Sequence, residues 1–182
     1  MFEVNMKSLK RILLITALFG TLASSLTAMQ SSNWVKFAPP GGGFSVMMPR
    51  EPQELAQTPV AGFTSHVYGE AVDGVVYVCL YGDYDPSVHL NPEEELAANR
   101  DNFLKAVKAA LTATKKIELD GRAGLEFSGE NAQSTYQSQV YILGNRVFQI
   151  AVELPKGAGD AANASRFLKS FAFTDTKEHG KP

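Results

Sequence analysis

One loop of the sequence holds two carboxylates and an imidazole within a short distance along the chain. Asp83, Asp85 and His89 fall in the segment Gly82–His89, and carboxylate oxygens and imidazole nitrogens are common metal ligands. The spacing matches no established metal-binding loop, because an EF-hand requires further carboxylates and a glycine at a fixed position. The segment also fits a plain turn that leads into a helix. These three residues are therefore a weak candidate metal site, and the sequence implies no cofactor.

A cysteine nucleophile is the next chemistry to consider. Cys79 is the single cysteine, and His66 could serve as its base. A reactive thiolate needs an accessible, electropositive setting, whereas Cys79 stands between Val78 and Leu80. We therefore expect a buried, inert thiol. No Ser–His–acid set has supporting spacing either, so no catalytic residue is predicted.

A glycine run in the first part of the chain raises the question of phosphate binding. Gly41–Gly43 precedes a predicted strand rather than a helix, and no Gly-Lys-Ser/Thr follows it. Phosphate loops depend on backbone N–H groups at the start of a helix. The run therefore predicts a chain break and not a phosphate site.

The strongest surface prediction comes from a hairpin. Asp73-Gly74 between two apolar runs indicates a two-residue turn, which places residues 66, 68 and 70 opposite residues 81, 79 and 77 on one face. The other face is apolar and is expected to contact a helix. The mixed face carries His66, Tyr68, Glu70, Tyr77, Cys79 and Tyr81. Since Tyr and His combine an apolar body with a polar tip, His66, Tyr68, Glu70, Tyr77 and Tyr81 are a candidate binding surface. The alternative is a sheet face covered by the second helix or by the N-terminal segment.

Further strands are expected on both sides of this hairpin. The predicted strands are 34–37, 44–48, 63–71, 75–84, 115–119, 123–128, 136–143 and 147–154. Turn signals at Asp120-Gly121 and Gly144-Asn145 join neighbouring strands, which predicts antiparallel pairing. Only a loop with an odd number of residues would place the apolar residues of both strands on the same face there, Val140 with Phe148 and Ile117 with Leu125. We therefore predict three-residue or bulged loops at these two turns.

Two helices are expected to cover the sheet. Asn91 is a good N-cap, and a proline and three glutamates follow it. Apolar residues on one face then continue to Leu111, which predicts a helix of about that extent. A second helix is expected from the N-cap Asp160 to about Phe171, and a last short strand is expected over Phe171–Phe173.

The N-terminus has the three parts of a secretory signal peptide. Basic residues precede a short apolar run, residues 12–22, and small residues follow it. A bilayer span needs about 20 apolar residues, so cleavage after Ala28 or Ser25 is expected; Met6 could be the true start. An uncleaved anchor is the alternative. We predict a periplasmic or secreted protein with no membrane contact after cleavage.

Charge and cysteine content narrow the function classes. Residues 1–28 hold three of the 17 basic and one of the 19 acidic residues, so their removal changes the formal charge from −2 to −4. A mildly acidic chain without a basic cluster is a poor candidate for nucleic-acid binding. One cysteine cannot form an intrachain disulfide, so the core alone must stabilise the fold.

Three segments resemble the Mog1/PsbP-like domains. Trp34–Phe37 with Gly42–Pro49 is similar to their opening, an aromatic residue followed by Gly-Phe-Ser-Val-x-x-Pro. Leu119–Phe127 resembles their central strand pair, and Phe167–Phe171 resembles their closing helix. The resemblance implies an antiparallel sheet between helices. It also implies an accessory or binding protein rather than an enzyme, since family members include a photosystem subunit and a small-GTPase partner. No functional residue carries over.

Together these observations predict an α+β fold, an antiparallel sheet flanked by two main helices in an α/β/α sandwich. We expect a signal peptide at 1–28, a single domain at 29–173 and a disordered tail at 174–182. The predicted function is a non-enzymatic binding or accessory protein whose partner is an envelope protein or a small ligand. The alternative is a hydrolase or metal-dependent enzyme that uses the His66 face or the Asp83–His89 loop.

Overall fold

The computed structural model describes residues 34–55, 62–157 and 160–174. In chain order the elements are β1 (Val35–Phe37), β2 (Phe44–Met48), β3 (Gln53–Leu55), β4 (Phe63–Val72), β5 (Val75–Tyr84), α1 (Pro92–Ala106), β6 (Ala110–Leu119), β7 (Arg122–Glu130), β8 (Ser134–Leu143), β9 (Arg146–Pro155), α2 (Ala161–Lys169) and β10 (Ala172–Phe173). Within these residues, seven strands form one sheet in the order β3-β4-β5-β9-β8-β7-β6, and β1-β2-β10 form a smaller one. Every neighbouring pair is antiparallel, which confirms the predicted α+β class. The predicted signal peptide lies outside the described residues.

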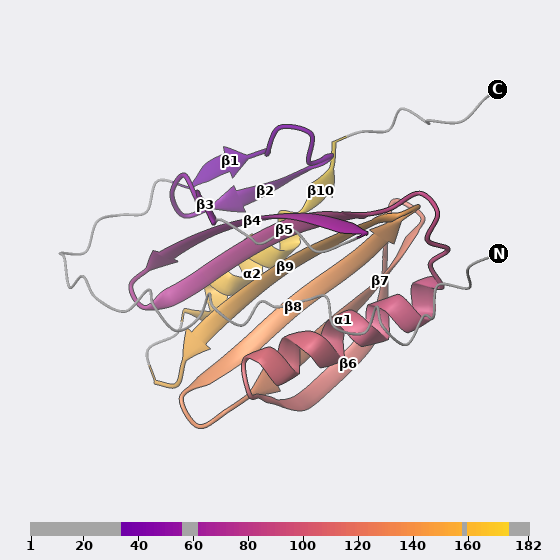
Figure 1. The fold of residues 1–182 in the computed structure, drawn as a ribbon. Helices are drawn as coiled ribbons and strands as arrows, with labels where there is room; N and C mark the ends of the chain where they lie inside the picture. The colour runs from indigo at the N-terminus through magenta and orange to yellow at the C-terminus, as the bar shows by residue number, and fades with distance from the viewer. Residues whose placement is uncertain (1–33, 56–61, 158–159, 175–182) are drawn as a thin grey trace.

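The central strands of the large sheet are covered on both faces (Figure 1). On one face, Leu96 and Phe103 of α1 join a core with Val67 and Leu80 of the β4–β5 hairpin. On the other face, α2 packs beside the small sheet, and both contribute to a second core. The predicted sandwich of two helices is therefore confirmed in outline. Its second outer layer also contains the three-stranded sheet, which the sequence did not predict as a separate layer.

Helix α1 begins where the sequence predicts and ends earlier. The Asn91 side chain accepts hydrogen bonds from the backbone N–H groups of Glu93 (3.1 Å) and Glu94 (3.5 Å), as an N-cap does. The helix stops at Ala106, and Lys108 takes a left-handed conformation with φ of 53°. Leu111, expected on the buried helix face, instead lies in β6 and is 44% exposed. The apolar periodicity continues past the turn, and no glycine marks the stop.

Helix α2 begins where the sequence predicts and ends at Lys169, two residues before the predicted end. Asp160 caps it through bonds from the N–H groups of Ala162 and Asn163. Phe167 and Phe171 are buried against the large sheet. None of the helices in residues 34–55, 62–157 and 160–174 is long and apolar enough to cross a membrane.

The β4–β5 hairpin has the predicted register. Val72 lies opposite Val75 across Asp73-Gly74, and both turn residues have positive φ, 52° and 79°. Two positive values are typical of a type I′ turn, whose twist matches that of the strands. His66 consequently lies opposite Tyr81, as expected.

The β6–β7 hairpin has a shorter turn than predicted. Asp120-Gly121 forms a two-residue turn with φ of 53° and 74°, which places Leu119 opposite Arg122. Lys116 therefore lies opposite Leu125 and Ile117 opposite Gly124, so the predicted match of Ile117 with Leu125 is wrong. The preference of Asp-Gly for the type I′ turn decides this register.

The β8–β9 hairpin likewise has a two-residue turn, so the predicted odd loop is wrong there too. Gly144-Asn145 sets Val140 opposite Gln149 on the α1 face, whereas Phe148 and Ile150 lie on the α2 face. Six consecutive residues of β9 are buried. The prediction assumed that the apolar residues of both strands share one buried face. Both faces of β9 are covered, so an apolar residue on either face is buried and this assumption is wrong.

The C-terminal boundary is one residue later than expected. The backbone N–H of Thr174 donates to the Gly43 carbonyl at 3.0 Å, so this residue belongs to the folded part of the chain. The rest of the predicted tail lies outside the described residues.

Candidate functional site

The structure brings the predicted binding face together and covers most of it. Tyr77 lies under α2 and under Trp34, the residue before β1, with its ring centroid 5.3 Å from Phe167 and 5.8 Å from Trp34. Tyr68 lies under β1, 4.9 Å from the Phe37 ring. The covered-face alternative therefore describes Tyr68 and Tyr77.

Two residues of the predicted face retain solvent contact. The side chain of His66 is 38% exposed, and that of Glu70 is 16% exposed, 3.9 Å from the Arg50 guanidinium. Burial raises the pKa of Glu70, and Arg50 acts in the opposite direction. Of the five predicted residues, His66 is thus the most accessible.

Around His66, polar side chains form a row across the four strands β3, β4, β5 and β9. We call it the cross-strand row, and its members are Glu54, His66, Tyr81, Arg146 and Asp83. The imidazole of His66 stacks on the Tyr81 ring at 4.7 Å and 16°, and the Arg146 guanidinium lies 4.9 Å from the same ring. His66 Nδ1 lies 3.0 Å from Glu54 Oε1 at one end. At the other end of the row, Asp83 forms an ion pair with Arg146. Tyr81 itself is buried, and the row is accessible at its charged ends.

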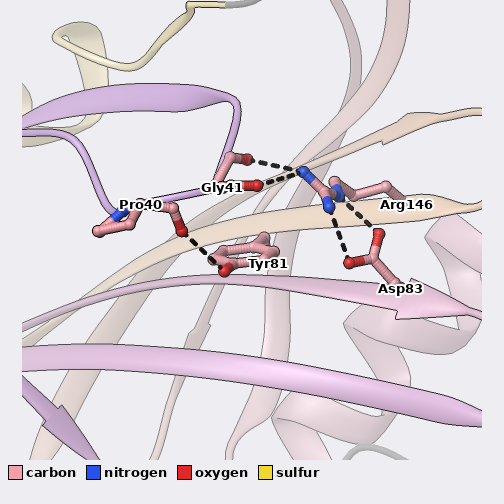
Figure 2. A network of polar contacts seen from close by, with 6 residues as sticks. Pro40, Gly41, Tyr81, Asp83 and Arg146 are labelled. Atoms are coloured by element: carbon pink, nitrogen blue, oxygen red, sulfur yellow. Dashed lines mark hydrogen bonds and ion pairs between the residues drawn. The ribbon is translucent and has the colours of Figure 1, made fainter. Parts of the chain in front are cut away.

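Arg146 ties this row to the loop between β1 and β2 (Figure 2). Its Nε and Nη2 donate to the two carboxylate oxygens of Asp83 at 2.6 and 2.8 Å, a bidentate geometry. Its Nη1 donates to the carbonyls of Gly41 (2.8 Å) and Gly42 (3.3 Å). The glycine run thus presents carbonyl oxygens to a cation. A phosphate loop would present N–H groups to an anion.

The Tyr81 hydroxyl makes a second link to that loop. It donates to the Pro40 carbonyl at 3.2 Å, while its ring packs 6.3 Å from Phe44 at the start of β2. A residue predicted for binding therefore holds the small sheet against the large one.

The three candidate metal ligands do not converge on one site, and two of them bond to other residues instead. Asp83 is paired with Arg146. Asp85 Oδ1 accepts bonds from the backbone N–H and hydroxyl of Ser87 (2.9 and 2.6 Å), which lower its pKa. Within the described ranges, no group of three or more His, Cys, Asp and Glu side chains could hold a metal ion. The structure therefore does not assemble Asp83, Asp85 and His89 into a site.

Cys79 is buried completely, as expected. Burial raises the pKa of its thiol well above the ordinary range. A neutral thiol is a poor nucleophile, so the arrangement does not support a Cys79–His66 pair.

A hollow of about 290 Å³ lies elsewhere, at the end of β9. It is lined by Thr135, Leu154, Pro155, Lys156, Gly157 and Ala161. None of the predicted site residues lines it, so it gives the enzyme alternative no convergent set of polar groups.

The tyrosines provide a direct test of this covered architecture. All six have a raised pKa, chiefly through burial, and those of Tyr68, Tyr77 and Tyr141 reach about 12 against an ordinary value of 10.0. An unfolded chain ionises at the ordinary value, so stability is lost as the pH rises from about 10 toward 12. Absorbance at phenolate wavelengths should therefore rise together with loss of near-ultraviolet circular dichroism. Phenolate formation near pH 10 in a fully folded chain would contradict this.

Two members of the row were missed from the sequence. Glu54 lies in the three-residue strand β3, too short for a periodic pattern, and Arg146 follows a turn at the start of an apolar strand. Asp83 and Arg146 are 63 positions apart in the sequence, and they meet because β5 pairs with β9. No local signal reveals such a contact.

No family model matches the sequence, and no curated protein matches it. Among solved structures, the fold is similar to the solution structure of cyanobacterial PsbP from Synechocystis sp., with a TM-score of 0.58 and 10% identity, covering 85% of this chain and 100% of that one. A crystal structure from Bacteroides thetaiotaomicron is 19% identical, with a TM-score of 0.40, covering 79% of this chain and 49% of that one. The first likeness confirms that the protein has a PsbP-like fold.

Proposed function

We propose that this protein is an exported, non-enzymatic accessory protein that binds a partner in the cell envelope or outside the cell. One observation carries the proposal: several of the groups that could do chemistry are committed to holding the fold, and the structure does not gather the others around an open site. Tyr68, Tyr77 and Cys79 are buried in the core, and Asp83 is paired with Arg146. An enzyme would need such groups to converge on an open site.

The accessible ends of the cross-strand row are the proposed contact surface. The Glu54 and Asp83 side chains are 56% and 43% exposed, and those of His66 and Arg146 are 38% and 29% exposed. The Arg146 guanidinium is paired with Asp83, and His66 Nδ1 lies 3.0 Å from Glu54 Oε1, so the surface presents alternating donors and acceptors. A partner with polar groups that match this alternation would gain hydrogen bonds and specificity rather than strong electrostatic attraction.

The fold and the N-terminal sequence favour the rest of the proposal. A PsbP-like fold agrees with the resemblance to accessory proteins. The basic and apolar segments before Ala28 favour export, and the buried Cys79 makes stability independent of disulfides. Mass spectrometry of the protein from its own cells should show a chain that begins after Ala28 or Ser25. A chain intact from Met1 or Met6 would contradict export with cleavage and favour a tethered protein.

Site-specific photo-crosslinking tests the contact surface. We would place p-benzoylphenylalanine at His66 and, as a matched control, at Lys105 on the solvent side of α1. An adduct of defined mass should form in cells from position 66 and not from position 105. Equal adducts from both positions, or none from position 66, would contradict the proposed surface.

An activity screen separates this proposal from the enzyme alternative. The purified chain should not hydrolyse ester, phosphoester or peptide substrates above the background of a His66→Ala variant. Turnover that this substitution abolishes would overturn the proposal.

A further inference from the structure

Strand β6 is an edge strand of the large sheet, and no other described strand pairs with its outer side. It is the last strand in the sheet order and pairs with β7 on one side (Figure 1). The segment 110–116 is exposed on both faces. A strand of ten residues with a free edge is a template for pairing with another strand.

The turn geometry fixes which backbone groups point outward. In a two-residue hairpin the residues that flank the turn exchange both hydrogen bonds, so the N–H and C=O of Leu119 point toward β7. Hydrogen-bonded and non-hydrogen-bonded positions then alternate along the strand. The outward groups are therefore those of Glu118, Lys116 and Thr114.

The charges at these outward positions are complementary to themselves. An antiparallel copy of β6 centred on Ile117 places Lys116 opposite Glu118 of the second chain and Glu118 opposite its Lys116. Both pairs fall at outward, hydrogen-bonding positions, and directly opposed side chains share a face. This register yields four backbone hydrogen bonds and two ion pairs, with the two Ile117 side chains in contact on the other face.

The neighbouring registers are unfavourable. A shift of the centre to Lys116 sets that residue opposite its own copy, and a shift to Glu118 does the same for the carboxylate. Like charges directly opposite destabilise a strand pair. Only the register centred on Ile117 sets each of these charges opposite its counter-charge.

The present partners of these side chains permit the contact. Lys116 Nζ pairs with Glu93 at the start of α1, and both side chains are mostly exposed, 81% and 75%. Within the described part of the chain, Glu118 forms no ion pair. A second chain would therefore supply the counter-charge that Glu118 lacks.

We infer that β6 is a self-association surface, through which two copies of this chain form a two-fold dimer with a continuous sheet. The bulge between Leu111 and Ala113 interrupts the strand, and bulges and lysines limit edge pairing. The ladder is thus confined to Thr114–Leu119, which makes the dimer weak and dependent on concentration.

Charge reversal tests the register. Sedimentation velocity of the chain without residues 1–28 should show a monomer–dimer equilibrium that K116E or E118K alone weakens about tenfold or more, because each places like charges opposite one another. The double variant K116E/E118K exchanges the charges and should restore the dimer. Lys105→Glu on α1 is the control and should leave the equilibrium unchanged.

Cysteine crosslinking gives an independent reading of the same geometry. Ile117→Cys should form an intermolecular disulfide under mild oxidation, because the two copies of this residue meet at about 4.5 Å between Cα atoms in a non-hydrogen-bonded pair. Thr114→Cys should not, since its copies lie far from the two-fold axis. A monomer at every concentration, or a dimer that neither single reversal weakens, would overturn the inference, as would equal crosslinking at both positions.

Discussion

Replacing Phe44 with alanine should lower the free energy of unfolding by about 3–5 kcal/mol, the range for a buried phenylalanine whose loss leaves a cavity. Phe44 is fully buried in β2 and stacks on Phe171 at 5.4 Å and 24°. It also lies 6.0 Å from Phe148 in the large sheet. One side chain thus links the small sheet, the segment after α2 and the large sheet. Urea denaturation followed by fluorescence and circular dichroism measures the loss.

A matched surface substitution separates this effect from a general loss of apolar area. Leu143 is 43% exposed beside the β8–β9 turn, so Leu143→Ala should change stability by no more than about 0.5 kcal/mol. The Phe44→Ala variant should still unfold in one transition, as expected of the single domain predicted for residues 29–173. A separate early transition, or a loss as small as that of Leu143→Ala, would show that the small sheet is not part of a common core.

The hairpins show which parts of this fold a sequence can predict. Asp73-Gly74 gave the correct register, since turn type and apolar alternation agree there. At Gly144-Asn145 the two signals disagree, and the two-residue turn prevails. The prediction assumed one buried face. Strand β9 is buried on both faces, so alternation carries no information about its register. For doubly covered strands, turn residues are the better guide.

The candidate site shows a different limit. Register correctly placed His66, Tyr68 and Tyr81 on one face. It could not show that β1 and β2 would cover much of that face, because that contact joins segments far apart in the chain. Tyr and His suit a ligand surface and a half-buried core equally well. Only the tertiary arrangement decides between them.

Arg146→Met should lower the free energy of unfolding by about 1–3 kcal/mol, within the range for hydrogen bonds to charged groups. The substitution keeps an apolar stem but removes the bidentate bonds to Asp83 and the bonds to the Gly41 and Gly42 carbonyls. Both side chains of the ion pair are partly exposed, 29% and 43%, and solvent screening places the expected loss below that of Phe44→Ala.

A double-mutant cycle with Asp83→Asn isolates the ion pair, because the two residues are in direct contact and their effects should not add. Arg146→Lys should recover only part of the loss, since an ammonium group cannot make the bidentate contact. Hydrogen exchange gives the local readout: the Gly42 N–H, bonded to the Pro39 carbonyl at 2.9 Å, should exchange faster in Arg146→Met while amides in the centre of β9 keep their protection. Additive effects with an unchanged exchange rate at Gly42 would mean that the guanidinium does not hold this loop. The attachment of the small sheet would then rest on Phe44 and the aromatic rings around it.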